Sequence, residues 1–558
     1  MSQRFPRFLA LAALCVPLGL GCQGVVGEAV DGPHGPAAGP GQPGGPGNDP
    51  GAPGGLYCEE APTPLRRLSH EEYRETLRRL YPDVDIGDLG LPEDQISHEF
   101  DNDADALVVD GILAERYVDL GLELAPALVA AVAPCPDPGD LVACGEALVR
   151  REGRRLFRRP LSDEEVAAYA GFFRDGAGSI EDRATLTFAT LLSAPEFLYR
   201  FERPVAPLSA GEGADLDAYS LASRLAFFLW GSGPDDTLLD AAAAGRLDTD
   251  EGLRAEAERM LEDDRARETF VRFHRQWLDL DRIFDTPKAD EDGLDGRLRR
   301  AMVEETERFV ERVLFEEDGT LADLFSSPRV FLNDDIAELY GVPAPTDGWQ
   351  ETSIPERAGV LTRTAFLASH GHPDRPSPVL RGVFVLERIL CQGTGAPPPD
   401  AEAMGLAAAE DIDPATATNR ELYDAMTRDP GCRTCHDAIN PAGFVFEQFD
   451  TMGRFRTEEA NGRAIDASAE LLTLGPVDGA ADLGAALAAS EDARRCAVEK
   501  WARYAYGGGP MERAACFLDD LEAALADSGG RIRDLQLALV MHPSFRRMRL
   551  PAEEQETP

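Results

Sequence analysis

The sequence lacks the short motifs that mark several large enzyme classes. It has no G-x-S-x-G nucleophile turn, no H-E-x-x-H zinc motif and no G-x-x-x-x-G-K-[ST] phosphate-binding loop. It also has no apolar run of the about 20 residues that a membrane-spanning helix needs, once a shorter apolar N-terminal segment is set aside. These absences argue against a serine hydrolase of the common type, a zincin protease, a P-loop nucleotidase and a helical membrane protein.

Positive charge is scarce as well. The 558 residues include 55 Lys+Arg against 100 Asp+Glu, which gives a formal net charge of −45. A surface of this charge repels other polyanions, so we expect no nucleic-acid partner and no direct contact with anionic lipid. Apolar residues make up 43% of the chain, which is ordinary for a globular protein. The length exceeds what one hydrophobic core usually organises, so we expect several packed modules.

The alternating pattern typical of β-strands is rare, whereas helix signals are frequent. Ser69 with Glu72, and Ser162 with Glu165, have the spacing of capping boxes at helix N-termini. Later segments such as "YSLASRLAFFLW" carry apolar residues at i, i+3, i+4 and i+7. The sequence therefore predicts a mainly α protein, built from several packed helical modules with long loops.

The N-terminus has the features of an export signal. Arg4 and Arg7 precede the apolar segment "FLALAALCVPLGLG", and Cys22 follows a small residue, Gly21. We expect a signal peptide of lipoprotein type over residues 1–22, with lipidation at Cys22, and an ordinary secretory signal is the alternative. Residues 23–57 are rich in Gly and Pro and are expected to form a disordered linker. We expect the protein in the periplasm or at the outer membrane, where the lipid would be its only membrane attachment. The cell surface is a further possible location.

Export makes disulfides the expected state of most cysteines, because free thiols tend to oxidise outside the cytoplasm. Cys135 and Cys144 bracket a short loop and could pair locally. Cys496 and Cys516 bracket a segment that could form a helical hairpin. By subtraction this pairing would leave Cys58 with Cys391, although sequence alone does not determine connectivity.

The remaining two cysteines belong to the motif C-x-x-C-H, in "DPGCRTCHDAINPAGF". Two thiols at this spacing can form thioethers with the two vinyl groups of haem, and the adjacent imidazole can bind the iron. Cys432 and Cys435 are therefore the predicted attachment residues for haem c, and His436 is the predicted iron ligand. The expected export agrees with this, because bacterial haem c is attached outside the cytoplasm.

The sequence defines the sixth iron ligand less clearly than it defines the two attachment cysteines and His436. Met452 is the nearest methionine after the motif and is the predicted ligand, since a thioether there would favour electron transfer. An open position would instead permit ligand chemistry. The rival ligands are Met404, Met426, His370 and His372. Four aromatic residues could line a haem pocket or form ordinary core: Phe444, Phe446, Phe449 and Phe455.

Other chemistry is open to the same motif. C-x-x-C supplies half of a tetrahedral zinc site, which Cys391 with His370 and His372 could complete across a long insertion. The two thiols could also cycle as a redox disulfide or form a static one, although the βαβ context of thioredoxin-like motifs is missing.

Five segments together resemble a known arrangement of domains. They are "RRLSHEEYRETLRRLYPDV", "RRLFRRPLSDEEVAAYAGFF", "YSLASRLAFFLWGSGPDDTLLDAAAAGRL", "RAGVLTRTAFLASHGHPDRPSPVLRGVFVLERILCQ" continuing to the C-x-x-C-H region, and "CAVEKWARYAYGGGP". This order resembles the planctomycete-type exported multidomain proteins of unknown function, with the domain series 1587, 1595, 1592, 1588 and 1585. The expected modules span residues 63–130, 138–206, 214–343, 356–458 and 468–546.

The resemblance implies a helical architecture and a cytochrome c-like motif in the fourth module, and it assigns no reaction. We expect an exported envelope protein that carries haem c and transfers electrons with a redox partner protein. One alternative is a non-redox scaffold or binding protein whose C-x-x-C-H is a zinc or disulfide site. Another is a haem-dependent enzyme that acts on an extracellular substrate.

Overall fold

The computed structural model describes residues 63–135, 139–289, 292–316, 319–413, 415–508 and 515–550. The predicted signal peptide over residues 1–22 with Cys22, the predicted linker over residues 23–57, and Cys58 lie outside the described residues.

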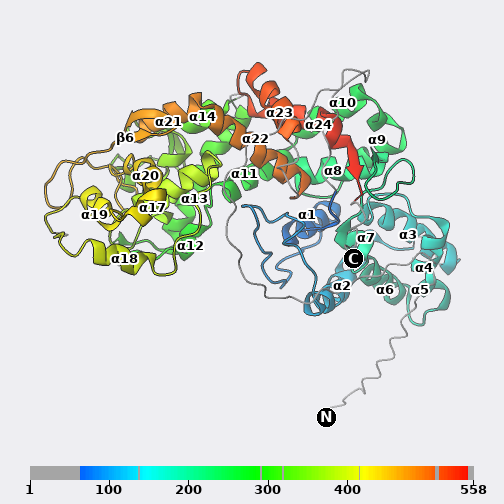
Figure 1. Ribbon diagram of the computed structural model, residues 1–558. Helices are drawn as coiled ribbons and strands as arrows, with labels where there is room; N and C mark the ends of the chain where they lie inside the picture. The colour runs from blue at the N-terminus through cyan, green and yellow to red at the C-terminus, as the bar shows by residue number, and fades with distance from the viewer. Residues whose placement is uncertain are drawn as a thin grey trace, which may run out of the picture. The chain divides into compact units, whose positions relative to one another are not determined.

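The described residues confirm the predicted mainly α fold (Figure 1). Toward the N-terminus the helices are α1 (His70–Leu80), α2 (Gly111–Val132), α3 (Leu141–Leu156), α4 (Asp163–Tyr169), α5 (Gly171–Asp175), α6 (Ile180–Leu192) and α7 (Pro195–Leu198). The middle of the chain forms α8 (Ala218–Trp230), α9 (Asp236–Ala243), α10 (Asp250–Leu261), α11 (Asp264–Trp277), α12 (Arg282–Asp285), α13 (Gly296–Glu311), α14 (Leu321–Ser326), α15 (Asp334–Tyr340) and α16 (Thr364–Ser369).

The remaining α-helices follow in the C-terminal part. They are α17 (Pro378–Phe384), α18 (Ala401–Ala408), α19 (Asn419–Met426), α20 (Pro430–Phe444), α21 (Ala480–Ala489), α22 (Glu491–Tyr506), α23 (Ala515–Asp527) and α24 (Ile532–Met541). Short 3₁₀ or π turns are η1 (Arg246–Asp248), η3 (Arg312–Glu316), η4 (Val360–Thr362), η5 (Val385–Ile389) and η7 (Pro543–Arg546).

The strands in the described part are short and form two-stranded antiparallel ladders. They are β1 (Arg66–Arg67), β2 (Tyr199–Arg200), β3 (Gly213–Asp215), β4 (Arg329–Leu332), β5 (Gln350–Ser353), β6 (Ser468–Leu471), β7 (Gly475–Asp478) and β8 (Arg547–Arg549). β1 pairs with β2, β3 with β8, β4 with β5, and β6 with β7. Because β3 and β8 are far apart in sequence, their pairing ties the C-terminal segment to the start of the third predicted module.

Local sequence signals set the helix starts as predicted. Ser69 caps α1 and Glu72 bonds back to the Ser69 backbone, which makes a complete capping box. Ser162 and Glu165 form the same arrangement at α4. Each box satisfies backbone N–H groups that have no partner inside the helix, so the signal depends only on residues within one turn.

The helices pack into two hydrophobic cores. One core consists of buried residues between Tyr73 and Leu198. The other contains Phe100 and residues from Leu216 to Met548. The first two predicted modules thus share one core, and the last three share the other. Neighbouring modules complete one another's apolar surfaces, as expected when single modules are too small to bury enough area alone.

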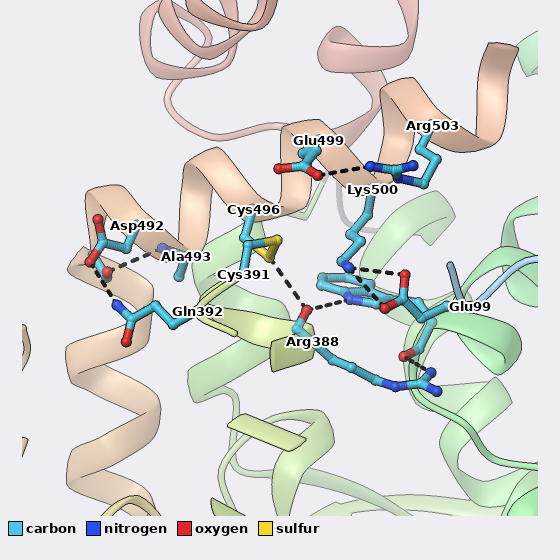
Figure 2. Close-up of a disulfide and its surroundings, with 12 residues drawn as sticks. Glu99, Arg388, Cys391, Gln392, Asp492, Ala493, Cys496, Glu499, Lys500 and Arg503 are labelled. Carbon is cyan, nitrogen blue, oxygen red and sulfur yellow. Dashed lines mark hydrogen bonds and ion pairs between the residues drawn. A yellow bond between two sulfur atoms is a disulfide. The ribbon is translucent and has the colours of Figure 1, made fainter. Parts of the chain in front are cut away.

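The loop before α2 links the two cores. Phe100 stacks on Phe273 at a centroid distance of 5.2 Å and meets Tyr504 edge-on at 5.3 Å. Next to it, Lys500 of α22 donates to both carboxylate oxygens of Glu99, at 3.0 and 2.9 Å (Figure 2). An apolar anchor and an adjacent, largely buried ion pair therefore hold this loop against the second core.

The disulfides agree with the sequence-based pairing in one case and correct it in another. Cys135 and Cys144 are bonded, as their short loop predicted. The predicted partners Cys516 for Cys496 and Cys58 for Cys391 are wrong, because Cys391 is bonded to Cys496 (Figure 2). Cys391 follows η5 with a left-handed φ of 51°, and this turn brings it to the buried Cys496 on α22. Cys516 is disulfide-bonded too.

Removing the Cys391–Cys496 disulfide is expected to cost more stability than removing the Cys135–Cys144 disulfide. The first closes a loop with a sequence separation of 105 and the second a loop with a separation of 9. Loop-closure entropy alone predicts a difference of about 2 kcal/mol in the free energy of unfolding. We expect Cys391→Ala/Cys496→Ala to show the larger loss in denaturant titrations, with Cys135→Ala/Cys144→Ala as the matched control. Equal losses would contradict the entropic account.

Candidate functional site

The C-x-x-C-H motif lies in the first two turns of α20. Pro430 occupies the first helical position, where its missing N–H costs nothing, and Cys432, Cys435 and His436 follow. Both cysteines are free thiols; Cys435 is exposed and Cys432 is partly buried. A permanent disulfide between them, one of the alternatives, is therefore not what the structure shows. The helix places Cys432, His436 and Asn440 along one face, because they are four residues apart.

Close packing fixes α20 against α17. Gly382 of α17 and Gly443 of α20 lie where the helices meet: a Cβ on Gly382 would overlap the carbonyl oxygen of Ile439, and one on Gly443 would overlap that of Pro378. Only residues without a side chain permit this approach of two backbones. The position of the motif is thus set by contacts near the far end of its helix.

Arg381 holds the segment that follows α20. Its side chain is fully buried and donates to the carbonyl oxygens of Phe446, Phe449, Leu367 and Asp450, at 2.9 to 3.0 Å. Burial lowers the pKa of the Arg381 guanidinium to about 10. Four carbonyl acceptors offset the cost of burying this charge without a bonded carboxylate.

A second buried polar contact holds α19 beside α20. The Asn419 side-chain amide donates to both carboxylate oxygens of Glu447, at 3.0 and 2.9 Å. Burial raises the pKa of Glu447 to about 7, and the bond from Asn419 opposes this shift. The start of α19 is therefore tied to the segment after α20, so the two helices form one frame around the motif.

A groove of about 380 Å³ lies between α19 and α20. His436 lines it, together with three arginines and one of the predicted aromatic residues, Phe444. The lining residues from α19 and the turn after it are Arg420, Asp424, Thr427 and Arg428, and those from α20 are Arg433, His436, Asp437, Asn440, Pro441 and Phe444. Its volume is in the range of small-molecule and cofactor sites.

The three arginines of the groove already have partners, but most of these contacts are at the surface. Arg428 pairs with Asp411 at 2.9 Å and Arg433 with Asp437 at 3.1 Å, all with more than half of the side chain exposed. Arg420 donates to the carbonyl oxygen of Ser468 at 2.7 Å. Exposed pairs of this kind contribute about 0–1 kcal/mol, so Arg428 and Arg433 can exchange partners for another anion at little cost.

His436 is held by hydrogen bonds that cross from α20 to α19. Its Nδ1 lies 2.9 Å from Oδ1 of Asn440, and the Asn440 amide nitrogen donates to Oγ1 of Thr427 at 2.8 Å. The Thr427 hydroxyl in turn donates to the carbonyl oxygen of Tyr423 at 2.8 Å. Asn440 is 5% exposed. The imidazole therefore has a defined orientation on a mostly buried polar chain.

The predicted sixth ligand lies elsewhere. Met452 is fully buried in the larger hydrophobic core, in the turn after α20, and is not among the residues that line the groove. Phe446 and Phe449 belong to the same core, and Phe455 is 39% exposed. Of the four predicted aromatics, Phe444 is the one that reaches the groove, and the role of Met452 as a ligand stays a prediction.

The rival ligands have other surroundings. Met404 on α18 is about half exposed. Met426 on α19 lies against Gly405 of α18. His370 is buried, with Nδ1 3.0 Å from the carbonyl oxygen of Phe366, and burial lowers its pKa to about 3. Burial also lowers the pKa of His372.

The zinc alternative loses one of its proposed ligands. Cys391 is bonded to Cys496 and so is no free thiolate for a zinc site with Cys432 and Cys435. Within the described ranges no three His, Cys, Asp or Glu side chains are grouped closely enough to hold a metal ion.

Sequence reasoning missed Asn440, Thr427 and the three arginines. Asn440 could have been found, because it stands four residues after His436 in a segment that reads as a helix. Thr427 and Arg420 could not, since they belong to the end of α19 and to α19 itself, and no sequence pattern brings them to the groove.

Comparison with known families gives five matches along the chain. Each family is described as a protein of unknown function: DUF1587 at residues 66–130, DUF1595 at 144–202, DUF1592 at 216–342, DUF1588 at 357–459 and DUF1585 at 475–545. This is the order that the sequence predicted. The DUF1588 match contains the whole groove and motif. No curated protein and no solved structure shows significant similarity. None of the helices in the described ranges offers an apolar stretch long enough for a bilayer.

Proposed function

The chain carries the domain series 1587, 1595, 1592, 1588 and 1585, and each of these families is described as a protein of unknown function, so we propose a role for the chain from its own site. The protein is an exported envelope protein that carries one covalent haem c and transfers electrons. The observation that carries this proposal is the placement of two free thiols and an imidazole on one helix, α20, where His436 lines a groove of about 380 Å³ and the two cysteines lie outside its lining.

The residues present fit haem c. Each thiol of Cys432 and Cys435 can add across one vinyl group, with sulfur on one carbon and hydrogen on the other, which needs no oxidant. His436 would bind the iron. When bound, the haem supplies one-electron oxidation and reduction.

The three arginines of the groove also suit this group, although Asp424 and Asp437 line the groove with them. Haem carries two carboxylates, and Arg420, Arg428 and Arg433 line a groove on a chain whose net charge is −45. A local group of arginines offers charge-assisted hydrogen bonds to carboxylates where the rest of the surface would repel them.

Export has support of its own. The disulfides Cys135–Cys144 and Cys391–Cys496 are of the kind that persists in oxidising compartments. We place the mature protein in the periplasm or on the outer membrane, tethered by lipid at Cys22, with a redox partner protein in the envelope.

A pyridine haemochrome assay tests the proposal. The full chain is exported in a host with c-type maturation machinery and extracted with acid–acetone, and we expect one haem per chain to stay bound. Cys432→Ala/Cys435→Ala should reduce bound haem to background. Thr434→Ala is the matched control, because Thr434 is an exposed residue between the two cysteines and its replacement should leave haem content unchanged.

Folded, exported protein without haem would overturn the proposal. Zinc analysis and thiol titration would then test the scaffold or binding alternative. Bound haem with a high-spin spectrum that readily takes up small ligands would overturn the electron-transfer role and favour a haem-dependent enzyme.

A further inference from the structure

The hydrogen-bond chain behind His436 determines which of its ring nitrogens carries the proton. The Thr427 hydroxyl donates its only hydrogen to the carbonyl oxygen of Tyr423, so its oxygen must accept from Asn440. The group of Asn440 that faces Thr427 is therefore the NH₂ group. The amide oxygen of Asn440 then faces Nδ1 of His436, at 2.9 Å.

An amide oxygen can only accept a hydrogen bond, so Nδ1 of His436 must be the protonated nitrogen. In the neutral ring this leaves the lone pair on Nε2, the nitrogen that is free to bind a metal. The carbonyl of Tyr423 is the origin of this order, because a carbonyl oxygen can only accept, and it accepts from both the hydroxyl and the backbone N–H of Thr427. The side chains of Thr427, Asn440 and His436 then each have one orientation in which all of these hydrogen bonds form.

We propose that Asn440, oriented by Thr427, is the positioning residue of the iron-ligand histidine. It holds His436 as the Nδ1–H tautomer and presents Nε2 for coordination. The inference rests on the proposed function for the identity of the metal group, and on the hydrogen bonds alone for the tautomer.

This arrangement acts before any haem is present. Burial of Asn440 and Thr427, at 5% and 9% exposure, protects their bonds from competition with water. A partner that accepts from the distal N–H of a ligand histidine fixes the ring and raises the basicity of the binding nitrogen. Folding alone therefore orients the His436 ring and fixes its tautomer for binding iron.

The tautomer can be measured by nitrogen NMR of full-length protein labelled with ¹⁵N-histidine. A Cys432→Ser/Cys435→Ser background keeps the protein free of covalent haem, and His436→Gln in the same background identifies the signals of this ring. We expect Nδ1–H to predominate. In Asn440→Leu the ratio of Nδ1–H to Nε2–H should fall roughly fivefold or more, as expected for loss of one hydrogen bond.

Two further variants separate positioning from general stability. Asn440→Asp keeps an acceptor and should retain the Nδ1–H tautomer. Thr427→Val removes the group that orients Asn440, and should shift the ratio in the same direction as Asn440→Leu, even if Asn440→Leu folds poorly. In haem-loaded protein with intact cysteines, Asn440→Asp should lower the reduction potential, because an anionic acceptor makes the imidazole a stronger donor to ferric iron.

The outcomes distinguish the two proposals. Normal haem loading with an Nε2–H tautomer in the parent, or with equal tautomer ratios in all variants, overturns the positioning role and leaves the proposed function standing. The expected tautomer ratios in a protein that never binds haem overturn the proposed function and the iron-ligand role of His436 with it.

Discussion

Replacing Gly443 by alanine is expected to destabilise the protein by about 3 kcal/mol or more and to lower its haem content. The added Cβ would overlap the carbonyl oxygen of Pro378, which is a backbone atom, and no rotamer change can move a Cβ. Overpacking usually costs about 1–3 kcal/mol because side chains can shift, and here only a displacement of α17 or α20 relieves it. Denaturant titration and the haemochrome assay measure the two effects.

Gly431→Ala is the matched control on the same helix. A Cβ on Gly431 has no atom within 4 Å. Alanine is favoured over glycine in a helix by about 0.5–1 kcal/mol, so this variant should be neutral or slightly stabilised. If Gly443→Ala behaved like Gly431→Ala, the close contact of α17 and α20 would not set the position of the motif.

The second large effect is expected at the buried ion pair between Glu305 on α13 and Arg363, which precedes α16. Both side chains are 0% exposed, and Nη1 of Arg363 lies 2.8 Å from Oε1 of Glu305. Arg363→Met would leave the Glu305 carboxylate buried without its partner. Such a change costs about 3–5 kcal/mol, because an uncompensated charge stays in a medium that solvates it poorly.

A double-mutant cycle tests this explanation. Glu305→Leu/Arg363→Met removes both charges and should be more stable than Arg363→Met alone. Glu304→Gln is a control from the preceding position of α13, where Glu304 pairs with Arg308 and both side chains are 40% exposed or more. We expect that change to stay within about 0.5 kcal/mol. A double variant no more stable than Arg363→Met would show that lost packing, not charge, is responsible.

Features that depend on neighbouring residues were predictable from the sequence. The capping boxes at Ser69 and Ser162 formed as expected, because each involves one helical turn. The helical character of most of the chain followed from apolar periodicity. The five-domain order was also readable, since each domain carries its own sequence pattern.

The pairing of the cysteines shows where this reasoning ends. Cys496 and Cys516 were paired because they are close in sequence, whereas Cys391 reaches Cys496 across 105 residues. Likewise, closeness to the motif favoured Met452 as a ligand, but its side chain is buried in the core. Proximity along the chain does not measure proximity in a packed protein, where helices from different modules share one core.

The sequence by itself determined the helical class, the helix starts, the order of the domains and the presence of two thiols and an imidazole at haem-binding spacing. These depend on interactions within a few residues. Only the tertiary structure decided which cysteines are bonded, that two cores serve the five modules, and that Asn440, Thr427 and three arginines surround His436. These features depend on burial and close packing between segments that are distant in the sequence, such as α19 and α20 at the groove, or η5 and α22 at the Cys391–Cys496 disulfide.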